Sequence, residues 1–244
     1  MDKILLAVLA LVFGFATIVH GAAVFETDSF ETDAGELDIT FIGHGTLLFT
    51  FGGKVIHVDP FSRLADYSQL PDADIIFITH EHGDHLDMKA IDSIQKKNTV
   101  IFSNRSGSSK LEGAVVMANG DVKEIEGLKI EAVPAYNLVQ MRSEGVPYHP
   151  KGNGNGYVIT FGDKRVYVAG DTENIPEMKD LKNIDIAFLP MNLPYTMTPK
   201  MTAEAARWFN PGILYPYHYG DTDPALVVDL LKNTDIEVRV RKMK

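Results

Sequence analysis

The 244-residue chain contains no cysteine, few positive charges and only one long apolar run. Without cysteine there is no disulfide framework, no lipoprotein attachment site and no thiolate ligand for a metal ion. Its 23 lysine and arginine residues are outnumbered by 33 aspartate and glutamate residues, which gives a formal net charge of −10. That balance provides no polybasic stripe for a phosphate backbone or an anionic lipid surface. We therefore expect no nucleic-acid partner.

The single long apolar run spans residues 4–19, after a short segment in which one lysine is offset by one aspartate. The run is shorter than the roughly 20 apolar residues that a membrane-spanning helix needs. Gly21 and Ala23 suit the −3 and −1 positions of a cleavage site. We expect residues 1–23 to be a signal peptide and the mature protein to be periplasmic or secreted, without stable membrane association. An uncleaved N-terminal anchor is the alternative. Residues 24–244 are long enough for one domain.

Three histidines and an aspartate occur within six residues, in His80-Glu81-His82-Gly83-Asp84-His85. They directly follow an apolar, β-branched run that is typical of a strand buried on both faces. His80 and His82 are two residues apart, so on an extended backbone they project from the same side and can bind one ion. A turn at Gly83 would bring Asp84 and His85 back to the same cavity, where they suit a second divalent cation. The sequence therefore predicts a metal site where this strand ends.

Surface histidines at the start of a helix are the alternative interpretation of this stretch. Asp87 is expected to cap a helix from Met88 to Lys97, because Ala90, Ile91 and Ile94 form an apolar stripe after it. A cap explains only Asp87. It leaves three histidines and Asp84 unexplained, so we favour the metal site.

The pattern His-x-His-x-Asp-His resembles the signature of the metallo-β-lactamase-fold hydrolases. The resemblance continues in the same order at Gly170-Asp171-Thr172 and Pro216-Tyr217-His218-Tyr219. Three further stretches are most similar to the ascorbate-6-phosphate lactonase-like branch: Phe41-Ile42-Gly43-His44-Gly45, Val58-Asp59-Pro60-Phe61 and Tyr195-Thr196-Met197-Thr198-Pro199. The resemblance implies a four-layer αββα sandwich, whereas the pattern of elements alone indicates only an α/β or α+β class.

The resemblance also implies a site for two divalent metal ions. His80 and His82 would bind the first ion together with a third ligand. The second ion would be bound by Asp84, His85 and His218. Asp171 would bridge both ions, and Asp84 would also orient the attacking water and accept its proton. Imidazole and carboxylate ligands make zinc the expected metal, with manganese or iron as alternatives.

The chain departs from the family pattern at Asn137, because many relatives carry a histidine there. An amide oxygen is a weaker ligand than imidazole. His149 lies twelve residues later, in a long loop. It is the one histidine in this part of the sequence that has no other assigned role. We predict that His149 completes the first metal site and that Asn137 lies beside it as a supporting or substrate-binding group. In the alternative, His149 merely lines the loop.

Three other residues near these motifs have open or structural interpretations. The resemblance implies that Asp59 is a structural carboxylate close to the metals. His57 is expected to be a hydrogen-bonded core histidine. His44 lies in a glycine turn, and the sequence does not decide between a supporting role at the site and an ordinary turn residue.

These residues predict a metal-dependent hydrolase that activates water to attack an ester, lactone, amide or phosphodiester of a small molecule. The alternatives are a periplasmic protein that binds a metal or ligand without turnover, and a nuclease of the same fold, which the net charge disfavours. Oxygen-reducing diiron relatives place a glutamate where His82 stands, so they are also disfavoured.

The pattern of apolar and turn residues predicts the remaining elements. Strands are expected within 37–60 and over 99–103, 185–189, 213–219 and 236–240, with antiparallel strands over 115–117, 121–125 and 128–134 and a hairpin of 157–161 and 166–169. A loop is expected over 138–156. One helix is expected to begin at Thr198-Pro199, and another to follow Asp223-Pro224 with an apolar face of Leu226, Val227, Leu230 and Leu231.

Overall fold

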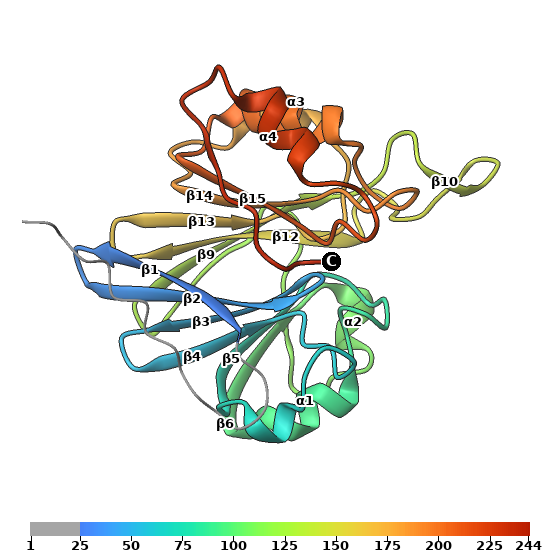
Figure 1. Ribbon diagram of the computed structural model, residues 1–244. Helices are drawn as coiled ribbons and strands as arrows, with labels where there is room; N and C mark the ends of the chain where they lie inside the picture. The colour runs from blue at the N-terminus through green and yellow to red at the C-terminus, as the bar shows by residue number, and fades with distance from the viewer. Residues whose placement is uncertain (1–24) are drawn as a thin grey trace, which may run out of the picture.

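Apolar side chains recur in short stretches from residue 37 onward, and these stretches form most of two seven-stranded sheets. The structure is a computed structural model that describes residues 25–244, and the expected signal peptide, residues 1–23, lies outside the described part. The sheets stack face to face with helices on their outer faces (Figure 1). This is the predicted four-layer αββα sandwich. Among residues 25–244, no helix is long and apolar enough to span a bilayer.

The first sheet takes its strands in chain order, with β1 to β4 antiparallel and β4 to β7 parallel. Its strands are β1 (Glu26–Thr32), β2 (Gly35–Gly43), β3 (Thr46–Phe51), β4 (Lys54–Val58), β5 (Ala73–Ile78), β6 (Gln95–Ser103) and β7 (Val115–Val116). The short helix η1 (Tyr67–Gln69) and α1 (Met88–Ile94) pack on its outer face, and α2 (Arg105–Ser108) follows β6.

The second sheet repeats this pattern, because β8, β9, β12 and β13 are antiparallel and β13 to β16 are parallel. Its strands are β8 (Val122–Ile125), β9 (Leu128–Ala135), β12 (Gly154–Phe161), β13 (Lys164–Val168), β14 (Ile186–Pro190), β15 (Ile213–Tyr217) and β16 (Glu237–Val238). Its outer face is covered by η2 (Pro176–Asp180), α3 (Pro199–Phe209) and α4 (Ala225–Leu231). A separate hairpin of β10 (Met141–Ser143) and β11 (Val146–Pro147) projects from the sandwich (Figure 1).

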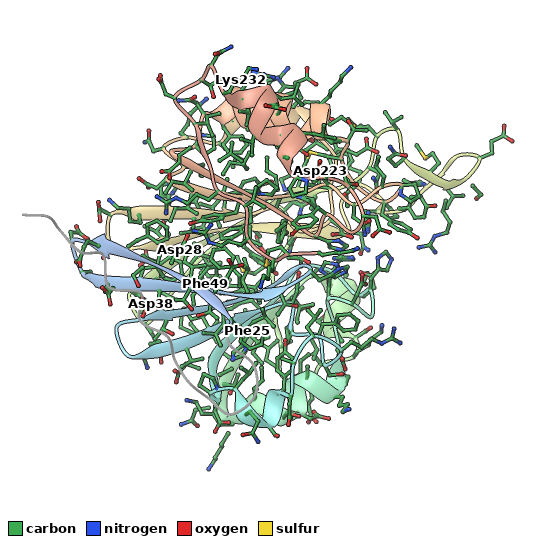
Figure 2. The ribbon with its side chains drawn as sticks, in the orientation of Figure 1. Phe25, Asp28, Asp38, Phe49, Asp223 and Lys232 are labelled. Atoms are coloured by element: carbon green, nitrogen blue, oxygen red, sulfur yellow. The ribbon has the colours of Figure 1, made fainter. Side chains whose placement is uncertain are left out.

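The central core lies between the two sheets. Phe49 of β3 is fully buried there (Figure 2). Its ring centroid lies 5.5 Å from that of Phe161 on β12. Burying such a ring contributes roughly 1.5–3 kcal/mol. On β5, Phe77 faces this core while Ile76 faces α1. The structure thus confirms that the strand before the histidine motif is buried on both faces.

The first helix is shorter than the sequence predicts. Asp87 caps it as expected, because its Oδ1 accepts a hydrogen bond from Lys89 N at 2.9 Å. The helix ends at Ile94 rather than Lys97, since Gln95 already pairs with Ala73 of β5 and begins β6. Strand pairing therefore overrides the helical propensity of the residues that follow.

Other differences concern strands whose partners lie far away in sequence. β7 pairs in parallel with β6, so only β8 and β9 of the three strands expected there form an antiparallel pair. The polar segment before residue 37 forms β1, which has no clear apolar signal of its own. The expected loop over 138–156 contains the β10–β11 hairpin and the start of β12. On α4, Leu226 is 49% exposed, so the buried face is narrower than predicted.

Candidate metal centre

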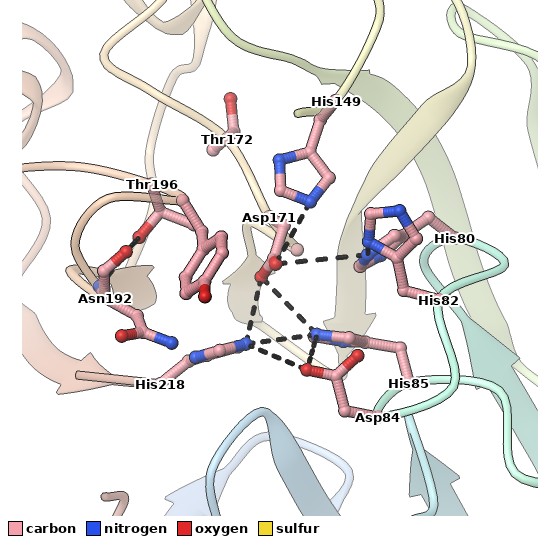
Figure 3. Close-up of polar contacts among 12 residues, drawn as sticks. His80, His82, Asp84, His85, His149, Asp171, Thr172, Asn192, Thr196 and His218 are labelled. Carbon is pink, nitrogen blue, oxygen red and sulfur yellow. Dashed lines mark hydrogen bonds and ion pairs between the residues drawn. The ribbon is translucent and has the colours of Figure 1, made fainter. Parts of the chain in front are cut away.

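The residues of the histidine motif begin immediately after β5, and the chain reverses there because Leu86 N donates to His82 O at 2.8 Å. Asp171 follows β13, and His218 follows β15. Figure 3 shows these side chains converging at one edge of the sandwich. A backbone hydrogen bond of 2.9 Å from His218 N to His44 O joins the end of β15 to the β2–β3 turn. Candidate ligands from both sheets therefore meet at a single site.

The first ligand cluster consists of His80, His82 and His149, which offer ring nitrogens that all lie within 4.8 Å of one another. His80 Nε2 lies 3.0 Å from His82 Nδ1. His149 Nε2 lies 3.2 Å from Asp171 Oδ2, and His80 Nε2 lies 3.9 Å from the same oxygen. Three imidazoles and one carboxylate oxygen thus surround one point.

The second ligand cluster consists of Asp84, His85 and His218, with His44 beside them. Asp84 Oδ2 lies 3.9 Å from His85 Nε2 and 3.8 Å from His218 Nε2. The other oxygen of Asp171, Oδ1, lies 3.5 Å from His85 Nε2 and 3.4 Å from His218 Nε2. Asp171 therefore presents one oxygen to each cluster.

Hydrogen bonds on the far side of three rings set which nitrogen faces the site. His85 Nδ1 donates to Asp59 at 2.8 Å. Thr79 Oγ1 donates to Asp59 at 2.7 Å, so it accepts from His80 Nδ1 at 3.0 Å. His149 Nδ1 donates to Asn137 Oδ1 at 2.7 Å. In each ring these bonds keep a proton on Nδ1 and leave Nε2 facing inward, which is the nitrogen that would bind a metal ion.

The charges of the site also suit metal ions. Burial lowers the pKa of His80 well below its usual value and that of His218 to about 4. Burial alone would raise the pKa of Asp171, but the neighbouring His218 and His85 hold it well below its usual value. For His85, burial is outweighed by the carboxylates of Asp171 and Asp59, which raise its pKa to about 10. The carboxylates of the site thus favour a nearby positive charge, which a divalent cation would supply in place of the proton on His85.

Unpartnered atoms point to the same conclusion. His149 Nε2 and Asp171 Oδ1 are buried and have no hydrogen-bond partner among the described residues. Such orphaned atoms are rare in native structures, and a bound ion is one partner that can satisfy them. Neutral imidazoles plus carboxylates are the usual ligands of zinc and related divalent metals. The residues present therefore fit the metals that the sequence predicts.

Comparisons with known proteins identify the family. The profile described as "Beta-lactamase superfamily domain" matches residues 38–218. A UPF0173 metal-dependent hydrolase of Methanoculleus marisnigri is 32% identical over 193 residues, covering 77% of this chain and 83% of the relative. Another from Methanopyrus kandleri is 30% identical over 198 residues, covering 76% and 85%. The chain belongs to the metallo-β-lactamase superfamily and is a metal-dependent hydrolase.

A solved structure agrees with this assignment. A protein from Parabacteroides distasonis, whose crystal structure is described as that of a "Putative metal-dependent hydrolase", is 55% identical in sequence to this superfamily member and superposes with a TM-score of 0.87. The superposition covers 90% of this chain and 100% of that one.

Two hollows open onto the metal centre of this hydrolase, and they share the walls formed by His82, Arg142, Tyr148, His149 and Asp171. The first hollow, of about 190 Å³, lies over the first ligand cluster. The second, of about 510 Å³, lies over the second cluster and is also lined by Asn192 and Tyr195. Asn192 points toward His218 in Figure 3.

The structure decides several interpretations that the sequence leaves open. His57 is a buried core histidine that donates from Nε2 to Pro71 O at 3.0 Å, as predicted, and burial lowers its pKa to about 4. His44 is both a turn residue and a neighbour of the site. Its φ is 52° in the β2–β3 turn, and its Nε2 lies 3.1 Å from Asp84 Oδ2. Gly83 is not needed for the turn, since its φ is not positive and a Cβ there would meet no atom within 4 Å.

Asn137 is placed beside His149, but it has no free group for a substrate. Its side chain is buried, with Nδ2 donating to Glu173 Oε1 at 3.1 Å and to Tyr195 O at 2.9 Å. Its Oδ1 accepts from both His149 N and His149 Nδ1. We therefore correct the substrate-binding interpretation of Asn137 to that of a supporting group.

Sequence reasoning missed Glu173, Arg142, Tyr148 and Asn192. Glu173 lies two residues after Asp171. It was missed because a glutamate in a loop is normally predicted to be exposed to solvent. Asn192 follows β14, the strand between β13 and β15, so the rule that strand ends collect functional groups could have found it. Arg142 and Tyr148 lie in and directly after the projecting hairpin, and no sequence motif includes them, so neither could be singled out from the sequence.

Proposed function

We propose that this hydrolase holds two divalent metal ions, zinc being the expected metal, and hydrolyses an ester, lactone, amide or phosphodiester of a small molecule. In the proposed site His80, His82 and His149 bind the first ion. Asp84, His85 and His218 bind the second. Asp171 bridges the two. When bound, such ions ionise water near neutral pH and stabilise the negative charge that develops on the group attacked.

One observation carries this proposal: the two oxygens of Asp171 face two adjacent ligand clusters, one oxygen to each. A single-ion site would leave either the Oδ2 side, with three imidazoles, or the Oδ1 side, with Asp84 and two imidazoles, without a cation. Packing so many ligand groups together without a cation would leave buried polar atoms unpaired, which is costly.

Asp84 is the carboxylate best placed for proton transfer. Its side chain is 39% exposed, whereas that of Asp171 is 5% exposed, so Asp84 is the one that a reacting water can reach. Burial would raise the pKa of Asp84, but the hydrogen bond from His44 and the charge of His85 hold it below its usual value. The ionised carboxylate can orient the attacking water and accept its proton.

The two hollows set the scale of the substrate. Their volumes of about 190 and 510 Å³ suit a small molecule better than a polymer. The similarity of residues 41–45, 58–61 and 195–199 to the ascorbate-6-phosphate lactonase-like branch supports including lactones among the candidate substrates.

The test is hydrolysis and metal content of the protein spanning residues 24–244, loaded with zinc and screened against panels of esters, lactones, amides and phosphodiesters. We expect two ions per chain. The variant Asp84→Asn should keep the fold. Its hydrolytic activity should fall by more than the roughly 100-fold that removal of a supporting group costs. Asp92→Asn, an exposed change on α1, is the control. Wild-type turnover by Asp84→Asn, or one ion per wild-type chain, would contradict the proposal.

A further inference from the structure

Arg142 is the only lysine or arginine, within residues 25–244, that lines either hollow over the metal centre. Two nearby lysines are occupied elsewhere. Lys151 Nζ lies 2.8 Å from Glu177 Oε1, and Lys110 Nζ donates to Glu81 O at 3.1 Å. In a chain with a formal net charge of −10, one guanidinium thus faces the cavity where the substrate must bind.

The guanidinium of Arg142 lies beside one aromatic ring and has no carboxylate partner among the described residues. Its Cζ lies 5.9 Å from the ring centroid of Tyr148, and that ring packs edge-on against Tyr195 at 5.0 Å. Among the described residues, Arg142 makes no ion pair and no side-chain hydrogen bond. A cation–π contact of this kind leaves the five N–H donors of an arginine available to a ligand.

The position of Arg142 is tied to that of the metal ligands. It lies on β10, and the base of its hairpin is fixed on one side by hydrogen bonds from Leu138 N and Gln140 N to Glu173, and on the other by His149. Tyr148 is the residue directly before His149. The Arg142 guanidinium and His149, one member of the first ligand cluster, therefore belong to one supported loop.

We propose that Arg142 binds an oxyanion of the substrate, a carboxylate or phosphate, at a point separate from the bond that is cleaved. The substrate class is then a small anionic molecule whose apolar middle lies against Tyr148 and Tyr195. This inference rests on the proposed function for where the substrate binds, but ion binding by Arg142 can be measured without turnover. A planar guanidinium matches both oxyanions because it can donate two parallel hydrogen bonds.

The experiment uses two probes of equal size: the mono-4-nitroanilide of glutaric acid, and the same anilide with its carboxylate replaced by a primary amide. Dissociation constants of both are measured by calorimetry with zinc-loaded protein at low salt. Charged hydrogen bonds predict that the wild type binds the carboxylate probe about 10- to 100-fold more tightly. In Arg142→Ala this ratio should fall close to one, and in Arg142→Lys it should take an intermediate value.

Arg63→Ala is the matched control. Arg63 is also exposed and lies 5.8 Å from a ring, that of Phe61, but it lines neither hollow over the metals, so its loss should leave the ratio unchanged. The inference is overturned if the wild type does not prefer the carboxylate probe over the amide probe, or if Arg142→Ala keeps that preference. It is also overturned if Arg63→Ala abolishes the preference as fully as Arg142→Ala does. Release of 4-nitroaniline is followed separately. Its absence would count against amide hydrolysis and not against the anion site.

Discussion

At the scale of single residues, Glu173 anchors the loop that carries His149. Its carboxylate is fully buried and accepts hydrogen bonds from Asn137 Nδ2 and from three successive backbone N–H groups, those of Leu138, Val139 and Gln140. Asn137 in turn holds the Nδ1 proton of His149. The departure from the family pattern at Asn137 is thus accompanied by a chain of contacts that directs another imidazole to the site.

We predict that Glu173→Gln weakens binding of the first ion by roughly 10- to 100-fold, because its NH₂ group cannot accept from the N–H groups that face it. His149→Ala should weaken the same ion further. Both variants should leave the second ion bound. Competition with a coloured chelator measures the two affinities, and Glu204→Gln, an exposed carboxylate that accepts from Asn174, is the control. Two ions at wild-type affinity in His149→Ala would exclude His149 as a ligand.

The sequence points to ligands where the chemistry is local or follows a strand. His80, His82, Asp84 and His85 form a dense motif that capping cannot explain. Placing Asp171 and His218 required the family resemblance in addition. Glu173 could not be predicted, because its role depends on where residues 138–140 fold, and nothing in the sequence fixes that position.

At the scale of elements, the β2–β3 turn forms one wall of the second ligand cluster. An added Cβ at Gly45 would lie 2.9 Å from His85 Cε1 and 3.4 Å from His218 Cδ2. The first distance is shorter than any ordinary contact, and His85 is fully buried with its Nδ1 bound to Asp59. The ring cannot move aside without breaking that hydrogen bond.

We therefore predict that Gly45→Ala lowers the affinity of the second ion at least tenfold while the first ion is retained, because the ring of His85, one of its proposed ligands, is displaced. Gly83→Ala is a matched control within the motif, since a Cβ there meets open space and the φ is not positive. Zinc content after dialysis against increasing chelator gives both affinities. Equal behaviour of the two variants would show that the turn does not position His85.

The sequence predicts elements well where the pattern is local and poorly where pairing is distant. The strands within 37–60 and the helix capped by Thr198 are found as expected, because alternation, turn glycines and capping are short-range signals. The extra length given to α1 and the missed strand β1 have one cause. Gln95 pairs with Ala73, and Glu26 pairs with Phe41, and such pairings are decided by the neighbouring strand.

At the scale of the whole molecule, the two sheets have the same design of an antiparallel half followed by a parallel half. The resemblance predicted this sandwich, but local patterns could not, because they do not say which sheet a strand joins. The proposed metal ligands come from both sheets: His80 to His85 follow β5 of the first, and Asp171 and His218 follow β13 and β15 of the second. Bound ions would therefore connect the two halves of the fold.

This connection predicts that metal removal lowers thermal stability. The unfolded chain has no assembled site, so each ion at a hundredfold excess over its dissociation constant stabilises the native state by about 2.7 kcal/mol. For a domain of this size that corresponds to a rise in Tm of roughly 5–10 °C. Calorimetry of residues 24–244 with chelator and with increasing zinc measures it, and Tm should rise with zinc concentration.

Magnesium at the same concentrations is the ion control, because it prefers oxygen ligands and should have little effect on a site rich in imidazole. Asp171→Asn is the protein control: it removes the charge of the carboxylate that faces both clusters, so most of the zinc-dependent rise should disappear. A Tm that does not respond to zinc would show that the ions do not hold the sheets together. If the zinc-dependent rise in Tm is unchanged in Asp171→Asn, the stabilising ion binds away from the Asp171 carboxylate.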